Sequence, residues 1–261
     1  MAIYITGDCH GDWMRRLNTA AFPEQKQMSR QEENYVLITG DFDIWDHSKR
    51  QKHDLDWLEA KTFTTLFADG NHENMDILDG LPVSRWHGGK VHFVRPHVIH
   101  LMRGQIYEIE GMRFFVFGGA SSHDIRDGIL EPKDPRIRKW ERDREKQFRV
   151  NHVSWWEREL PSEEEMEEGL GNLSRVGWKV DYIITHCPYT SLLGQMDGGS
   201  GLYRPDRLTD YLEGIKEKTD YRHWLFGHMH TDQAFPEQRS ACLYEQIVAL
   251  AKPGRVVYDI P

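Results

Sequence analysis

The stretch that decides the fold is Thr64-Thr65-Leu66-Phe67-Ala68-Asp69-Gly70-Asn71-His72-Glu73, in which an apolar run ends abruptly in a glycine and polar side chains. A short run of this kind predicts a strand buried on both faces, here over residues 64–68. Stretches of helical composition, such as residues 51–61, separate the early runs. This alternation predicts an α/β fold. Five further runs share the pattern, at residues 3–6, 35–39, 114–117, 182–185 and 223–226.

Two other regions predict strands that are joined by turns. The runs at residues 91–94, 98–102, 105–110 and 112–117 follow one another with short polar joints that leave no room for helices. Because Gly104 and Gly111 suit turns, we expect an antiparallel meander there. The runs at 243–250 and 255–260, joined by Lys-Pro-Gly, predict a hairpin. The sequence therefore indicates two sheets, one with strands connected by helical crossovers and one with strands connected by hairpins.

The chain of 261 residues is long enough to bury a sizeable core, and no internal repeat or low-complexity linker divides it. We therefore expect a single domain over residues 1–261. The one break in composition is the segment 121–176, which is rich in Lys and Arg at 133–149 and has five glutamates among residues 163–168. One interpretation is a pair of solvated helices, and the other is a helical insertion that caps a site.

Composition and charge limit the functional classes. A formal net charge of −9 argues against a dedicated nucleic-acid binder. No apolar run is long enough to span a membrane, and the first residues predict a strand rather than a signal peptide. The three scattered cysteines, Cys9, Cys187 and Cys242, argue against a disulfide framework and favour a reducing cytoplasm. Nothing in the sequence indicates the oligomeric state.

Polar side chains follow five of the predicted strands where each strand ends. In open α/β sheets, ligands bind beyond the carboxyl ends of strands, so we expect these side chains to converge. Two carboxylates, one amide oxygen and four imidazoles suit borderline divalent metals such as Mn, Fe, Co, Ni or Zn. Seven ligands are too many for one tetrahedral zinc and suit two metals that share a carboxylate. The seven residues are Asp8, His10, Asp41, Asn71, His186, His228 and His230.

The order D-x-H, G-D, G-N-H-E, H, G-H-x-H resembles the calcineurin-like metallophosphoesterase superfamily, from Asp8 to His230. The resemblance implies a four-layer α/β/β/α sandwich of two mixed sheets flanked by helices. It also implies that His72 faces the scissile phosphate, that Asp8, His10, Asp41 and His230 hold one metal, and that Asp41, Asn71, His186 and His228 hold the other, with Asp41 bridging.

The leading hypothesis is a metal-dependent phosphoric ester hydrolase, a phosphatase or phosphodiesterase with two divalent ions, Mn or Fe being favoured. A hydroxide that bridges the metals would attack a phosphomonoester or phosphodiester of a small molecule, with His72 as general acid. One alternative is a nuclease on DNA or RNA, which the acidic charge disfavours. The other is a non-catalytic binding or scaffold protein, which the complete ligand set disfavours.

The second motif departs from the superfamily pattern. Many members carry G-D-x-x-D-R-G, in which the second Asp often orients the catalytic histidine and the Arg often grips phosphate oxygens. In this chain Ile44 and Trp45 take those two places. Asp43 or Asp46 are candidates to replace the Asp. This departure makes a protein Ser/Thr phosphatase less favoured.

A phosphate-gripping cation must then come from another part of the chain. The candidates are Arg126 and the basic stretch 133–149. The loop 118–124 follows a predicted strand and could deliver Ser122 or His123 to the edge of the crevice. We therefore expect His123 and Arg126 to bind substrate.

Overall fold

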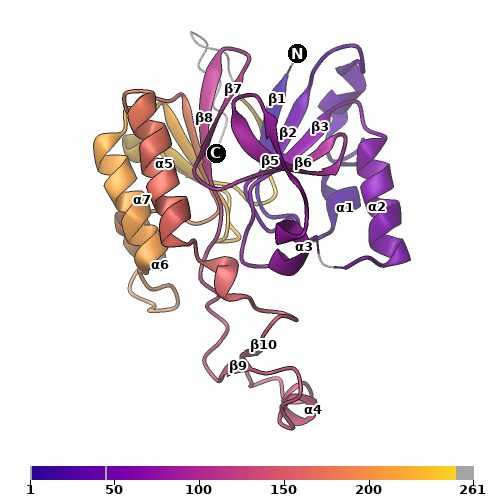
Figure 1. Cartoon of the computed structure of the whole chain (residues 1–261), viewed down its shortest axis with the longest axis vertical. Helices are drawn as coiled ribbons and strands as arrows, with labels where there is room; N and C mark the ends of the chain where they lie inside the picture. The colour runs from indigo at the N-terminus through magenta and orange to yellow at the C-terminus, as the bar shows by residue number, and fades with distance from the viewer. Residues whose placement is uncertain (1, 45, 251–261) are drawn as a thin grey trace.

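A computed structural model gives the conformation of residues 2–44 and 46–250. Two mixed sheets face each other, and helices cover their outer faces (Figure 1). The strands of the first sheet are β1 (Ile3–Thr6), β2 (Tyr35–Ile38), β3 (Thr64–Phe67), β4 (Val83–Trp86), β5 (Gly89–Arg95), β6 (Val98–Leu101) and β15 (Ile247–Ala249), in the order β15-β1-β2-β3-β6-β5-β4. The strands of the second are β7 (Gln105–Ile109), β8 (Met112–Phe117), β11 (Tyr182–Thr185), β12 (His223–Phe226), β13 (Gln233–Phe235) and β14 (Ser240–Cys242), in the order β13-β14-β12-β11-β8-β7.

Both sheets have a parallel centre and antiparallel edges. Strands β1, β2, β3 and β6 run parallel in the first sheet, and β14, β12, β11 and β8 run parallel in the second. Each of β2 and β11 is buried along its whole length, as the short apolar runs predict for strands covered on both faces. The parallel centres matter for function because their carboxyl ends lie at the same edge of each sheet.

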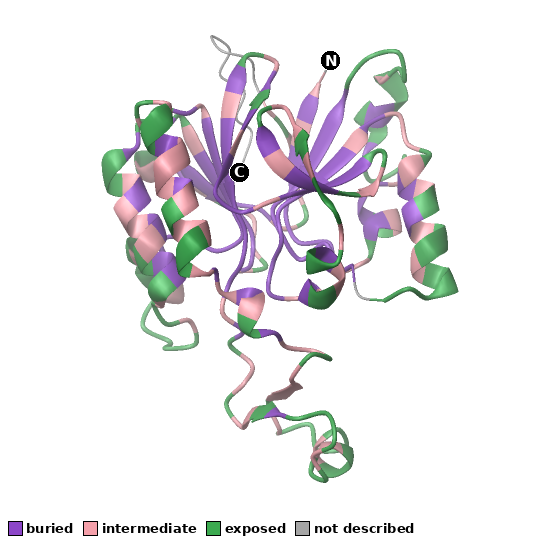
Figure 2. Cartoon of the chain, in the orientation of Figure 1, coloured by how far each residue is buried: buried purple, intermediate pink, exposed green. Residues whose placement is uncertain are grey.

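Three hydrophobic cores separate four layers. One core lies between the sheets and contains Leu37 of the first sheet and Ile184 of the second. A second lies between the first sheet and the helices α1 (Trp13–Arg16), α2 (Lys49–Glu59) and α3 (Met75–Asp79). The third lies between the second sheet and the helices α5 (Glu163–Arg175), α6 (Thr190–Asp197) and α7 (Arg207–Lys218). Figure 2 shows buried residues along the strands and exposed residues on the outer sides of the helices. The predicted α/β/β/α sandwich is therefore confirmed.

The predicted meander is wrong in its topology, although its strands are present. β5 and β6 pair in the first sheet, whereas β7 and β8 pair in the second. The chain crosses between the sheets at residues 102–104, where the N–H of Met102 donates to Lys90 O and that of Gly104 donates to Val116 O. Gly104 has φ +72°, a left-handed conformation that glycine adopts without strain. Each sheet therefore gains one antiparallel edge, and neither sheet is built from hairpins alone.

The carboxyl-terminal run 243–250 is not one strand. β14 ends at Cys242, and β15 begins at Ile247 and pairs antiparallel with β1. Between them Asp232 accepts hydrogen bonds from the N–H groups of Tyr244 and Glu245, which interrupts the extended chain. The second run of the predicted hairpin, residues 255–260, lies outside the described residues.

The segment 121–176 holds β9 (Gly128–Leu130), α4 (Ile137–Trp140), β10 (Phe148–Val150), the 3-10 helix η2 (Glu157–Glu159) and α5. β9 and β10 pair in parallel as a separate two-stranded sheet, and Figure 1 shows them with α4 projecting below the two large sheets. The basic stretch 133–149 thus contains one helix of four residues, whereas α5 packs on the second sheet. The single-domain organisation stays a prediction.

The remaining short elements are the 3-10 helices η1 (Pro23–Gln27) and η3 (Pro236–Gln238). Within residues 2–44 and 46–250, no helix is both long and apolar enough to cross a membrane. The three cysteines are buried and free. A cytoplasmic location stays a prediction.

Candidate metal centre

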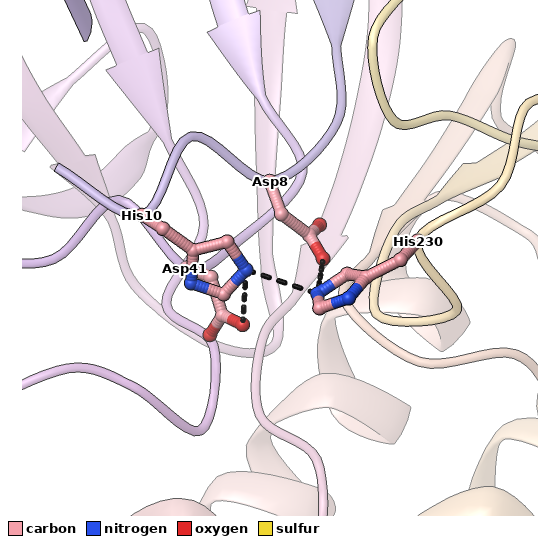
Figure 3. Close-up of side chains that lie close together, drawn as sticks. All are labelled: Asp8, His10, Asp41 and His230. Carbon is pink, nitrogen blue, oxygen red and sulfur yellow. Dashed lines mark hydrogen bonds and ion pairs between the residues drawn. The ribbon is translucent and has the colours of Figure 1, made fainter. Parts of the chain in front are cut away.

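Four of the predicted ligands lie in one cluster at the carboxyl ends of the strands. Asp8 and His10 follow β1, Asp41 follows β2 and His230 follows β12, and their side chains face one another (Figure 3). One ligand atom from each lies within 4.8 Å of the others. His10 Nε2 is 2.9 Å from His230 Nε2 and 3.8 Å from Asp41 Oδ2, and His230 Nε2 is 3.4 Å from Asp8 Oδ2.

The other three predicted ligands lie on the opposite side of Asp41. His186 Nε2 is 3.2 Å from Asn71 Oδ1 and 3.3 Å from Asp41 Oδ1. The ring centroids of His186 and His228 are 5.0 Å apart. Since Oδ2 of Asp41 faces His10 and Oδ1 faces His186, this carboxylate lies between the two groups. The structure brings together all seven residues that the sequence singled out.

The side chains fit divalent cations by their chemistry. Asp8 and Asp41 are each 1% exposed, so their charges are removed from water and require positive partners. Carboxylate, amide and imidazole donors of this kind suit Mn, Fe or Zn. No thiolate takes part among the described clusters of potential ligands. The donor set therefore supports metal binding without indicating which metal is bound.

Backbone conformation at the centre is unusual. His10, Asp41, His228 and His230 have φ angles of +46°, +45°, +67° and +48°. This left-handed region is uncommon for residues other than glycine and costs on the order of 1–3 kcal/mol at each position. Such strain clusters at functional sites because the surrounding packing holds the side chains in one arrangement.

Glycines beside the ligands are required by close packing. A Cβ atom on Gly40, at φ +132°, would lie 2.1 Å from His186 Nδ1. A Cβ atom on Gly70 would lie 2.0 Å from Asp41 Oδ1. These glycines therefore let one strand end approach the ligand side chain of another, in addition to permitting a turn.

Electrostatic coupling within the centre is strong. Burial raises the pKa of Asp8 to about 7, against the opposing effect of the His186 imidazole. Burial alone would lower the pKa of His186, but the carboxylates of Asp41 and Asp8 raise it to about 9. Burial lowers the pKa of His10 to about 4. Burial would raise the pKa of Asp41, but His186 holds it well below its usual value. The acids and imidazoles of the centre therefore depend on one another for charge balance.

Glu73, the last residue of G-N-H-E, organises the loop after Asp41. Its carboxylate accepts hydrogen bonds from the N–H groups of Phe42 at 2.7 Å, Asp43 at 3.0 Å and Ile44 at 3.1 Å. Burial and the nearby Asp41 raise the pKa of Glu73 to about 8, while two of these N–H groups oppose the rise. Glu73 is part of the motif in the sequence, but the role of its side chain depends on contacts with residues about 30 positions earlier in the chain.

His72 lies beside the cluster. Its N–H donates to Asp41 Oδ1 at 3.0 Å, and its ring centroid is 5.0 Å from that of His10. Ile44, at the place of the expected orienting Asp, is buried in the core of the first sheet. Of the two proposed replacements, Asp43 lies within 4.8 Å of ligand atoms of His10 and His72, whereas Asp46 accepts from the N–H of Ser48.

A cavity of about 690 Å³ opens beside the centre and includes His228 in its wall. His123 and Arg126 line this cavity, as expected for residues that contact substrate. The His123 ring is 5.8 Å from that of His228 and 4.8 Å from that of Tyr203. Tyr203, which the sequence did not single out, follows a glycine-rich loop that carries no motif. Their role in substrate binding stays a prediction.

Ser122 approaches the centre from the same loop as His123. Its side chain is buried, and its Oγ accepts a hydrogen bond from Asn71 Nδ2 at 3.4 Å. A further side chain, Arg149, reaches His72 from the projecting segment, with its Nη2 3.3 Å from His72 Nε2. The sequence indicated the basic stretch 133–149 as a source of cations but did not single out this residue.

Comparison with known proteins identifies one family. The model of the calcineurin-like phosphoesterase family matches residues 1–232. Among curated proteins, lariat debranching enzyme A of Xenopus laevis is 26% identical over 147 residues, which cover 50% of this chain and 26% of that protein. The chain thus matches about a quarter of the length of this relative.

Two solved structures have weaker similarity. A Staphylococcus aureus protein assigned as a 5′-nucleotidase is 14% identical with a TM-score of 0.42, covering 96% of this chain and 50% of that one. Phosphopantetheinyl hydrolase from Mycobacterium tuberculosis is 14% identical with a TM-score of 0.37, covering 93% and 88% of the two chains. These scores are too low to support an inference about this chain.

Proposed function

The chain belongs to the calcineurin-like phosphoesterase family, and we propose on this premise that it is a phosphoester hydrolase that uses two divalent metal ions. The observation that carries the proposal is the convergence of Asp8, His10, Asp41 and His230 within 4.8 Å. These four residues would hold one ion. Asn71, His186 and His228 would hold the other together with Asp41, whose two oxygens face the two groups.

When bound there, two divalent ions supply positive charge that stabilises the phosphoryl transition state and Lewis acidity that activates water. The protein supplies position and proton transfer. Asp41 would hold the two groups of ligands together, because its carboxylate offers one oxygen to each group. His72, fixed through its N–H to Asp41, would donate a proton to the leaving-group oxygen.

The cavity beside His228 is the proposed site for the leaving group. Its wall combines the rings of His123 and Tyr203 with the guanidinium of Arg126, so it offers aromatic contact and a positive charge. A volume of about 690 Å³ is in the range of small-molecule binding sites. We therefore favour a small phosphomonoester or phosphodiester, and manganese or iron as the metal.

A substrate panel with defined metals tests this function. Purified protein loaded with Mn²⁺ or Fe²⁺ should hydrolyse p-nitrophenyl phosphate or its bis-ester between pH 6 and 9, and elemental analysis should find two equivalents of metal. The Asp8→Asn variant is the matched control, because it preserves size while removing a ligand charge. Wild-type protein that binds two metals but hydrolyses neither ester contradicts the proposal and favours a binding or scaffold role.

One observation favours a nuclease as the second candidate. The projecting stretch 133–149 carries eight basic and four acidic side chains, and Trp140 lies 5.0 Å from both the Arg136 guanidinium and the Lys146 ammonium. Basic side chains around an aromatic ring suit a single-stranded polyanion. Cleavage of a single-stranded oligonucleotide, compared with that of a 2′,3′-cyclic nucleotide at several salt concentrations, separates the two candidates.

A further inference from the structure

The projecting segment returns to the candidate metal centre through β10. This strand pairs in parallel with β9, and Arg149 lies opposite Ile129. Beyond β10, the buried Trp156 donates from Nε1 to Asp76 Oδ2 at 2.8 Å. Asp76 is on α3, four residues after His72, so this contact sets the position of β10 relative to the His72 loop. Figure 1 shows α3 at the lower edge of the body of the protein, on the side from which the segment projects.

Arg149 is held rigidly beside His72. Its Nε and Nη2 donate to the two oxygens of Asp124 at 2.9 and 2.8 Å, and its Nη1 donates to Ser154 O at 3.3 Å. The Arg149 side chain is 13% exposed. A two-pronged guanidinium–carboxylate pair fixes both distance and plane, so Arg149 has little freedom to move away. This arrangement is that of a preorganised donor rather than a solvated surface arginine.

The contact with His72 brings one end of the Arg149 guanidinium beside the His72 ring. Nη2 of Arg149 lies 3.3 Å from Nε2 of His72. Because a guanidinium has no lone pair, Arg149 donates and Nε2 accepts in this contact, so Nε2 can carry the proton of a general acid only once a phosphate oxygen has taken this N–H. His72 is joined to Asp41 through its N–H, so Arg149 is one residue away from the candidate ligands. An anion that accepts from Arg149 at this point lies within reach of His72.

We propose that Arg149, oriented by Asp124, binds the phosphate oxygens of the substrate beside His72. This inference rests on the proposed phosphoesterase function. Arg149 would take the place of the arginine that many members of the family carry in the second motif, where this chain has Trp45. The projecting segment thus supplies a cation that the second motif does not provide.

Arg149 has the donors that such a role requires. A guanidinium carries five N–H groups, and the contacts among the described residues use four of them, one on His72. A phosphate oxygen can accept the N–H directed at His72 together with the remaining one. Hydrogen bonds from arginine to phosphate are charge-assisted and are often two-pronged, which selects phosphate over a neutral group.

Binding of inorganic phosphate to the metal-loaded protein tests the proposal without relying on turnover. Calorimetry with Arg149→Gln should show phosphate affinity lower by about 10–100-fold, in line with the loss of a charge-assisted contact. Arg149→Lys should lose less, because it keeps the charge but lacks the planar fork. KM for p-nitrophenyl phosphate should rise with the loss of affinity, while metal content stays at the wild-type value.

Arg222→Gln is the control. Arg222 also pairs with an aspartate, Asp181, at 3.1 Å, but it is 49% exposed and precedes β12, at the opposite end of that strand from the candidate ligands. This variant should bind phosphate as the wild type does.

The possible results distinguish failure of the proposed Arg149 role from failure of the proposed phosphoesterase function. If wild-type protein binds phosphate and hydrolyses the ester, and Arg149→Gln does both equally well, the role of Arg149 is overturned. The same conclusion follows if Arg149→Gln and Arg149→Lys lose metal in parallel with phosphate, because the arginine then acts on structure. If metal-loaded wild-type protein neither binds phosphate nor hydrolyses an ester, the proposed function itself fails.

Discussion

Nε2 of His10 lies 2.9 Å from Nε2 of His230, although the two residues are 220 positions apart in the chain. Each imidazole also faces a buried carboxylate, Asp41 for His10 and Asp8 for His230. Two ring nitrogens at this distance share at most one proton between them, whereas a divalent cation satisfies both at once. The fold therefore builds a set of donors that is best satisfied by a metal.

Removal of metal should lower thermal stability. A ligand that binds only the folded state at 100 times its Kd contributes about 2.7 kcal/mol, which for a chain of this size corresponds to a Tm shift of about 5–10 °C. We expect a chelator to lower the Tm of the wild type by this amount in differential scanning fluorimetry. Asp41→Asn, which removes the carboxylate shared by both groups, should show no chelator effect. An unchanged Tm in the chelated wild type would count against a resident metal.

His72→Ala should separate proton transfer from metal binding. The hydrogen bond from His72 to the Asp41 carboxylate is donated by the backbone N–H, which alanine keeps. We expect wild-type metal content and a kcat lower by about 10²–10⁴-fold for alkyl phosphates, with a smaller loss for p-nitrophenyl phosphate, whose leaving group needs less protonation. If His72→Ala loses metal as severely as Asp41→Asn, the general-acid assignment is wrong.

Glu73→Ala should unfold the loop that carries Asp41. The substitution leaves the buried N–H groups of Phe42, Asp43 and Ile44 without their carboxylate acceptor. The expected cost is about 3–5 kcal/mol in the free energy of unfolding, together with loss of metal. Urea denaturation measures the first effect and elemental analysis the second. Glu157→Gln, at an exposed position, serves as control, and a cost below about 1 kcal/mol for Glu73→Ala would refute this role.

Acid should destabilise the protein partly through His92. Burial, and then the neighbouring imidazole of His100, lower the pKa of His92 to about 4. Because the unfolded chain takes up this proton near pH 6.5, it binds more protons than the folded protein between pH 6.5 and 4, and stability falls as the pH falls through that window. The wild type should lose up to about 3 kcal/mol more than His92→Gln between pH 7 and 4.

Urea unfolding at a series of pH values measures this difference. His53→Gln is the matched control, because the His53 side chain is 74% exposed. Equal pH dependence of the wild type and His92→Gln would show that His92 titrates alike in the folded and unfolded chains.

Much of the fold was predictable from local pattern. The strands at 182–185 and 223–226 have the predicted bounds, because strands buried on both faces carry an unbroken apolar signal in the sequence. The assignment of strands to sheets was not predictable in the same way. β5, β6, β7 and β8 have similar patterns and short joints whether they form one sheet or two, and burial of Arg103 against Asp69 at the crossing is visible only in the folded chain.

The candidate ligands were predictable because each follows a strand in a short motif, and parallel strands must place their ends together. Arg149 and Tyr203 were not, because no motif surrounds either residue. The contact between Arg149 and His72 spans 77 positions. Its geometry depends on where the projecting segment is anchored, by Trp156 and Asp76, and not on the residues next to it.

Local sequence pattern therefore predicted the buried parallel strands, the α/β class and the seven residues that converge at the candidate metal centre. The tertiary structure alone decided how the strands divide between two sheets, which oxygen of Asp41 serves which group of ligands, and which cation reaches His72. The physical reason is the range of the interactions. Alternation of apolar and polar residues and turn preferences act over a few positions, whereas side-chain contacts across 77 or 220 positions exist only once the cores have packed.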